Sequence, residues 1–417
     1  MDPVSQDRLN EEVTIGSLGG QGDGIATAPG GNFFVPFTLS GETVLVSGSG
    51  QKRKLAEIIK PSPQRIAPVC RHFGICGGCQ LQHFETAHYL EWKCGLVAEA
   101  LAREGVTAQI EPVIGFGAHN RRRVVFTAMR AENRILLGFS QKQTNKIADI
   151  SQCPVLLPEI EARLADFRVM CMLLAPKKGA MKLTVLACDN GLDVACDNGG
   201  FSPAKAQQEA IAQAGRTGFA RLSLNGEALV TFKQPMLRIG KANVMPPPEA
   251  FVQAVAGAEQ AMAMLVVAHL KDARHTADLF SGFGAFALRM AENSSVYAAD
   301  SSGAAIAALD RAWRETGGGL KTITADRRDL SRRPLMADEL KKMQGVVFDP
   351  PRAGAEEQAR ELAKSKVARI AAVSCNPASL ARDLRLLLDG GYKLLSATPI
   401  DQFVFTPHVE CVALLER

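Results

Sequence analysis

From about residue 250 onward, strand-like runs alternate with helix-like runs, and this alternation constrains the fold more than any other feature. Runs such as HTADLFSG, VYAADSS and GVVFDPP have the apolar character of buried strands, whereas GAAIAALDRAWRETG has helical spacing. Strand–helix alternation builds βαβ units, and these form a parallel, doubly wound sheet that binds ligands at the carboxyl ends of its strands. We therefore predict an α/β, Rossmann-like domain over residues 249–417, with two more strands in its tail.

Two other regions precede this domain. Residues 10–60 contain short strand-like runs separated by Gly-rich turns, which indicates a small β-barrel. The region that follows mixes β-rich runs with a helix near residues 88–105, which we expect to pack on the last domain. The full length of 417 residues suits two or three domains. We predict three: 1–66 as an OB-like barrel, 67–248 as an α+β domain, and 249–417 as the α/β domain.

Composition limits the class of protein. The hydrophobic content of 47% predicts a soluble globular chain, and the net charge of +5 permits a nucleic-acid partner without requiring one. The longest apolar run, AMAMLVVAHL, is too short to span a bilayer, and the polar first residues do not resemble a secretory signal. We expect a cytoplasmic protein without a membrane partner, and nothing in the sequence requires more than a monomer.

A cysteine cluster follows the predicted barrel. Cys70, Cys76 and Cys79 form C-x5-C-G-G-C, and Cys153 comes much later in a turn. In a reducing compartment, clustered cysteines favour metal binding or catalysis over disulfides. Four thiolates can hold a [4Fe–4S] cluster or tetrahedral zinc, and three close cysteines with one distant one favour the cluster. The simpler alternative is a set of buried cysteines without a ligand.

The segment DLFSGFGAF, residues 278–286, ends a strand and opens a helix. Gly282 and Gly284 would let a ligand approach the backbone closely at the carboxyl end of that strand. Asp300 ends the next strand and can accept hydrogen bonds from ribose hydroxyls, and Asp326 ends a third strand, where it could meet an adenine amino group. The chain lacks both G-x-G-x-x-G and the P-loop lysine at this position, so the pattern favours a nucleoside cofactor without phosphates.

Two further strand ends carry reactive groups. Asp349 opens DPPRAG after the strand GVVF, and Cys375 follows the strand RIAAV. Carbon 5 of uracil is too weak a nucleophile to attack a sulfonium methyl, but adding a thiolate to carbon 6 activates it. This chemistry needs a cysteine of depressed pKa and a base that removes the proton from carbon 5. Cys375, Glu410 and Asp349 can fill the roles of nucleophile, base and reader of the uracil edge.

At these residues the chain resembles the bacterial uracil-5 RNA methyltransferase family, which acts on tRNA or large-subunit ribosomal RNA. The resemblance covers nearly the whole chain. SCNPASLARD is similar to the family's nucleophile motif and implies Cys375 as the nucleophile. HVE resembles its C-terminal motif and implies Glu410 as the base. DPPRAG looks like its substrate and donor loop, which implicates Asp349.

The same resemblance extends to the cofactors. DLFSGFGAF is similar to the first S-adenosylmethionine motif and implies a donor contact at Phe280, and FVQ resembles an F-x-Q motif, so Gln253 would touch donor or uracil. The cysteine spacing is similar to that of the cluster-bearing members, and residues 10–60 resemble the TRAM domain, an RNA-binding barrel. The TRAM domain and the cluster together favour 23S rRNA over tRNA as substrate. The family usually has Cys, Asn and Glu where this chain has Ser281, Ala285 and Asp300.

Basic residues suggest where RNA would lie. Arg121, Arg122 and Arg123, with Arg130 and Arg134, could contact phosphates or form a solvated face, and Lys52 to Lys54 would extend that surface across the barrel. The target base must leave its stack to react, so we expect loop or single-stranded RNA.

Two alternatives use the same residues differently. A cytosine-5 methyltransferase shares the thiolate chemistry, but those enzymes usually carry Pro-Cys, whereas Asn-Pro follows the cysteine here. An Fe–S RNA-binding protein with a degenerate methyltransferase fold would have no use for the nucleophile, the base or Asp349.

Overall fold

The computed structural model describes residues 11–142, 144, 146–200 and 204–417, which divide into two compact units. The first unit comprises Met1–Trp92, Phe139–Gln152 and Phe405–Pro407, and the second comprises Lys93–Gly138, Cys153–Val404 and His408–Arg417. The division into three domains stays a prediction, and its first ten residues lie outside the described part. In that part, no helix is both long enough and apolar enough to cross a membrane.

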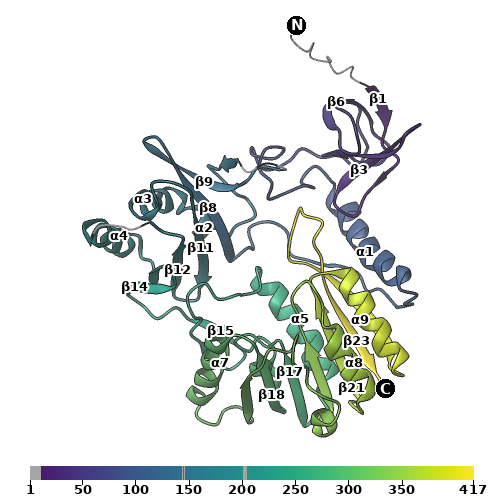
Figure 1. Cartoon of the computed structure of the whole chain (residues 1–417), viewed down its shortest axis with the longest axis vertical. Coiled ribbons are helices and arrows are strands. Elements are labelled where there is room, and N and C mark those ends of the chain that lie inside the picture. The colour runs from purple at the N-terminus through teal and green to yellow at the C-terminus, as the bar shows by residue number, and fades with distance from the viewer. Residues whose placement is uncertain (1–10, 143, 145, 201–203) are drawn as a thin grey trace. The chain divides into compact units, whose positions relative to one another are not determined.

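The first unit contains a small β region, as expected from the short strands. It has two three-stranded sheets, of order β2-β3-β4 and β1-β5-β6 (Figure 1). Their strands are β1 (Glu11–Thr14), β2 (Ser17–Leu18), β3 (Asp23–Ala28), β4 (Gly31–Pro36), β5 (Thr43–Ser47) and β6 (Lys54–Lys60). Alternate side chains of these strands, including Phe33, Val35, Val44 and Val46, form one buried core. Strand β10 (Ile147–Asp149) also belongs to this unit.

The second unit begins with a mostly antiparallel sheet, in which β12 and β13 are the parallel pair. Its strands are neighbours in the order β9 (Arg134–Ser140), β8 (Arg123–Ala131), β11 (Ala180–Cys188), β12 (Gly191–Asp197), β13 (Arg221–Leu224) and β14 (Glu227–Thr231). The helices of this region are α2 (Pro158–Glu161), α3 (Leu164–Leu174) and α4 (Ala204–Thr217). The rings of Phe126, Phe167 and Phe219 pack between sheet and helices. A hairpin of β15 (Leu237–Ile239) and β16 (Ala242–Val244) follows.

The predicted Rossmann-like domain is present as an eight-stranded sheet of order β19-β18-β17-β20-β21-β23-β22-β7. These strands are β7 (Ile114–Gly115), β17 (His275–Leu279), β18 (Ser295–Asp300), β19 (Ile323–Arg327), β20 (Gly345–Phe348), β21 (Arg369–Ser374), β22 (Lys393–Asp401) and β23 (Glu410–Glu416). Strands β17 to β21 are parallel, and β23 runs antiparallel to both β21 and β22. The tail therefore forms the two extra strands expected from it.

Helices cover both faces of this sheet (Figure 1). One face packs against α5 (Ala256–His269), α6 (Ala287–Met290) and α7 (Gly303–Glu315). The other packs against α8 (Glu356–Lys364), α9 (Pro377–Asp389) and two residues of α1 (Thr86–Arg103), Val97 and Leu101. A short 3-10 helix, η1 (Glu339–Lys342), precedes β20. Because both faces are covered, the loops at the carboxyl edge of the parallel strands are left to form the site.

Candidate active site

One cavity of about 650 Å³ lies at this carboxyl edge of the sheet. It is lined by loops that follow β17, β18, β19, β20 and β21, together with residues 250–253 and the start of β23. Seven residues that the sequence singled out line it: Gln253, Phe280, Gly282, Asp300, Asp349, Cys375 and Glu410. The strand order therefore gathers residues that are up to 157 positions apart in sequence, from 253 to 410.

The donor loop, residues 280–286, turns sharply after β17. Phe280 and Gly282 both have positive φ, 62° and 54°. Asp300 holds the loop: one carboxylate oxygen accepts the backbone N–H of Gly282 at 2.9 Å, and the other accepts that of Ser302 at 2.7 Å. This carboxylate thus fixes both the donor loop and the start of α7, which is a structural role that the sequence did not indicate.

Two predicted donor contacts are not on the cavity wall. Asp326 does not line the cavity, because its carboxylate accepts a 2.6 Å hydrogen bond from the hydroxyl of Tyr297. Asp329, Leu330 and Ser331, just beyond the end of β19, occupy the wall there instead. Gly284 is also absent from the wall, and its N–H closes the turn on the carbonyl of Ser281 at 2.9 Å.

The cavity is acidic and partly aromatic. Burial, together with the neighbouring carboxyl groups of Asp349 and Asp300, raises the pKa of Asp278 beneath the donor loop. The hydroxyl of Ser281 is buried on the wall and has no hydrogen-bond partner among the described residues. Clustered carboxyl groups beside the rings of Phe280, Phe283 and Phe286 suit a cationic ligand with an apolar part, such as an adenosyl sulfonium.

Sheet register brings the two predicted reactive residues together. Ser374 of β21 pairs with Cys411 of β23. Because the two strands are antiparallel, Cys375, which follows Ser374, lies opposite Glu410, which precedes Cys411. Asp349 is the first residue after β20, the other neighbour of β21. All three line the cavity.

A continuous chain of hydrogen bonds links Asp349 to Glu410. Gln253 donates to Asp349 Oδ2 at 3.0 Å, and Gln402 donates at 2.7 Å both to Gln253 Oε1 and to Glu410 Oε1. The second carboxylate oxygen of Glu410 is buried and has no partner among the described residues. Burial and the nearby Asp349 carboxyl raise the pKa of Glu410, and burial raises that of Asp349.

The expected depressed pKa of the nucleophile is not what the structure gives. Burial raises the pKa of Cys375 to about 11, with the carboxyl groups of Glu410 and Asp349 adding to it and Arg352 opposing it. The physical reason is that a thiolate here would be half-buried beside two acids. Burial and the two acids therefore favour the thiol form of Cys375.

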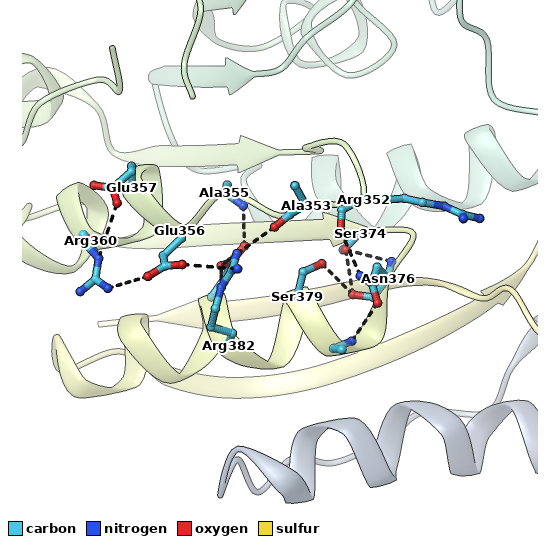
Figure 2. A network of polar contacts seen from close by, with 12 residues as sticks. Arg352, Ala353, Ala355, Glu356, Glu357, Arg360, Ser374, Asn376, Ser379 and Arg382 are labelled. Carbon is cyan, nitrogen blue, oxygen red and sulfur yellow. Dashed lines mark hydrogen bonds and ion pairs between the residues drawn. The ribbon is translucent and has the colours of Figure 1, made fainter. Parts of the chain in front are cut away.

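A polar network fixes the loop after β20 against the start of α9 (Figure 2). Asn376 caps α9, accepting from the N–H of Ala378 at 3.2 Å, and its amide donates to the carbonyl of Arg352 at 3.0 Å. Gly354 has φ of 83°, and a Cβ there would come within 2.5 Å of the guanidinium of Arg382. The loop carrying Asp349 and the turn carrying Cys375 are therefore one rigid assembly.

A buried lysine closes the base of the loop that precedes Glu410. The ammonium of Lys93 is fully buried and pairs with Asp401. It also donates to the carbonyls of Phe403 and His408, at 3.2 and 2.6 Å. Lys93 thus bonds both ends of the loop, at Phe403 and at His408. Sequence reasoning missed this role because Lys93 lies on a helix with an ordinary amphipathic pattern.

Three of the arginines predicted to contact RNA form hydrogen bonds within the protein. Arg122 donates to Glu259 at 2.6 Å and to the carbonyl of Gln253 at 3.1 Å, and Arg123 donates to the carbonyl of Ala250 at 3.1 Å. Arg130 is likewise bonded to the carbonyl of Ala175. Arg122 and Arg123 therefore contact residues 250–259 beside the cavity, and phosphate contact by the basic residues stays a prediction.

The cysteine motif is divided between the two units. Cys70, Cys76 and Cys79 are half-buried and belong to the first unit, and Cys153 belongs to the second. Within the described ranges, no group of three or more His, Cys, Asp or Glu residues is placed to hold a metal ion. The [4Fe–4S] cluster therefore stays a prediction.

Comparison with known proteins shows the family of this chain. A family model for tRNA (uracil-5-)-methyltransferase matches residues 205–417. An uncharacterized RNA methyltransferase of Brucella suis is 49% identical over 97% of this chain and 98% of its own length. The 23S rRNA (uracil(1939)-C(5))-methyltransferase RlmD of Pectobacterium atrosepticum is 30% identical over 97% of this chain and 93% of its own.

A solved structure shares the fold. Pyrococcus abyssi tRNA (uracil-54, C5)-methyltransferase, in complex with S-adenosyl-L-homocysteine, superposes with a TM-score of 0.73. The match has 23% sequence identity and covers 97% of this chain and 99% of that one. With the matching family model and the full-length relatives, the chain belongs to the tRNA (uracil-5-)-methyltransferase family of S-adenosylmethionine-dependent RNA methyltransferases.

Proposed function

We propose that this enzyme forms 5-methyluridine through a covalent protein–RNA adduct, with Cys375 as nucleophile and Glu410 as base. The observation that carries the proposal concerns one carboxylate oxygen of Glu410, Oε2. It is buried, has no partner in the described part of the chain, and belongs to the same cavity wall as Cys375 and Asp349. A buried carboxylate oxygen of raised pKa is suited to accept a proton from carbon.

Each residue then has one task. The thiolate of Cys375 adds to carbon 6 of a flipped uracil, and carbon 5 becomes nucleophilic. Phe280, Gly282 and Asp300 would hold S-adenosylmethionine, which would supply the methyl group to carbon 5 and leave as S-adenosylhomocysteine. Glu410 removes the proton from carbon 5, the bond from sulfur to carbon 6 breaks, and the thiolate leaves. Asp349 contacts the uracil edge.

Trapping tests this sequence of bonds. RNA containing 5-fluorouridine has no proton at carbon 5 for the base to remove, so wild type with donor should form an adduct that survives denaturing gels. Cys375→Ala should form none, whereas Cys94→Ala, which removes another half-buried thiol, should behave as wild type. Absence of any wild-type adduct would refute the covalent proposal.

A second variant tests the base. Glu410→Gln should accumulate a methylated adduct on natural RNA, with turnover reduced by about 10²- to 10⁴-fold. Glu416→Gln, at the exposed far end of β23, is the matched control. Ready turnover by Glu410→Gln would remove Glu410 from its role.

We propose 23S rRNA as the substrate, and tRNA is the second candidate. Support comes from the likeness to RlmD over nearly the whole chain and from the TRAM-like barrel, where Lys52 and Lys54 are exposed. Methylation of 23S and tRNA transcripts, followed by nucleoside mass spectrometry, decides between them. The same spectra distinguish 5-methyluridine from 5-methylcytidine, which the cytosine-5 alternative would produce. A monomeric state and a cytoplasmic location stay predictions.

The cluster prediction rests on the spacing of the four cysteines alone. Anaerobically purified protein should contain about four irons per chain if it is right. Stoichiometric zinc, or neither metal, would refute it.

A further inference from the structure

We infer that Gln402 is a positioning residue that holds Glu410 and Gln253 in one working geometry. The inference rests on the proposed role of Glu410. Gln402 comes directly after β22, is 2% exposed, and does not line the cavity. It therefore acts through its neighbours.

The amide of Gln402 has only one orientation that satisfies its surroundings. Its oxygen accepts the backbone N–H of Ala254 at 3.1 Å, which directs the NH₂ group toward the two acceptors, Glu410 Oε1 and Gln253 Oε1. Turning the amide over would set its oxygen against both of those oxygens and leave the N–H of Ala254 unpaired. All its hydrogens and its carbonyl are thus in use.

This orientation sets that of the next amide. Because Gln253 Oε1 accepts from Gln402, its own NH₂ group is the one that faces Asp349. Gln402 is therefore the donor at the centre of the chain of hydrogen bonds. That chain of hydrogen bonds ends at Asp349 on one side and at Glu410 on the other.

The same bond selects which oxygen of Glu410 works. Gln402 occupies Oε1 and leaves Oε2 as the buried oxygen without a partner among the described residues. Without that bond, the carboxyl group could rotate, and a stabilising donor to its charged form would be lost. The consequence is a slower proton removal after methyl transfer.

Gln402→Met tests this with little change of volume. We expect turnover on natural RNA to fall about 10- to 100-fold, methylated adduct to persist on that RNA, and the rising limb of the pH–rate profile to move to higher pH. Gln358→Met is the control, since Gln358 is equally buried but, among the described residues, its side chain bonds the backbone of Leu335 and not the active site. Gln358→Met should leave the rising limb of the pH–rate profile and the level of methylated adduct unchanged.

Gln402→Glu provides a second reading if the methionine variant folds poorly. It keeps the acceptor for Ala254 but places a second carboxyl group beside Glu410. The rising limb of the pH–rate profile should therefore move to a higher pH than in Gln402→Met. The inference would be overturned if both Gln402 variants had the turnover of wild type, its level of methylated adduct and its pH–rate profile. Failure of wild type to trap 5-fluorouridine RNA would instead overturn the covalent mechanism, so the two failures are distinct.

Discussion

Replacing Lys93 by methionine removes a cation that the fold has enclosed completely. The side chains of Lys93 and Asp401 are 0% and 2% exposed, so the variant leaves a carboxylate buried without its counter-ion. Breaking such a pair costs about 3–5 kcal/mol. The carbonyls of Phe403 and His408 also lose a donor, at about 1 kcal/mol each. We expect a loss of about 5 kcal/mol, a large part of the stability of an ordinary domain.

Urea unfolding followed by fluorescence, together with hydrogen exchange of the peptide that spans β22 and β23, measures this loss. Lys366→Met removes an exposed lysine and should change stability by less than about 0.5 kcal/mol. The double variant Lys93→Met/Asp401→Asn should recover part of the loss, because no charge stays buried. A Lys93→Met protein within about 1 kcal/mol of wild type would refute the reasoning.

Three further predictions concern the walls of the cavity. Arg352→Gln should slow adduct formation and shift its pH dependence upward, because Arg352 lowers the pKa of Cys375; an unshifted profile from pH-dependent trapping would contradict this. Gly354→Ala should reduce activity and the unfolding midpoint together, since its Cβ meets the side chains at the start of α9; wild-type behaviour in both assays would contradict it. Glu259→Gln should cost about 3–5 kcal/mol in urea unfolding, because it removes the carboxylate with which both Arg122 and Arg289 pair; a smaller change than about 1 kcal/mol would count against it.

The sequence was sufficient for the catalytic domain because its signals are local. Each parallel strand is a short apolar run that ends in a polar or glycine-rich turn, and the carboxyl ends of parallel strands meet at one edge. Phe280, Asp349 and Cys375 could therefore be assigned to one site without a structure. Asp326 does not line the cavity: the strand β19 ends one residue later, and its side chain bonds Tyr297.

The basic run was harder to interpret for a related reason. Charge in a sequence says nothing about whether a guanidinium group faces solvent or a buried acid. Arg122 lies 137 positions from its partner Glu259, and that pairing arises only when β8 meets the start of α5. A count of arginines could not distinguish this buried pair from a phosphate contact.

The pKa of Cys375 could not be predicted from the sequence, because it depends on which charged groups lie beside the sulfur in the folded protein. Its chemistry requires a thiolate, yet the residues that make it useful, Glu410 and Asp349, are acids that oppose that charge. Arg352 acts in the opposite direction, as a bound cationic donor would. We therefore expect binding of S-adenosylmethionine to lower the pKa of Cys375. If so, the rate at which iodoacetamide alkylates Cys375 should rise on adding S-adenosylmethionine, and an unchanged rate would argue that the charge of the donor does not reach the sulfur.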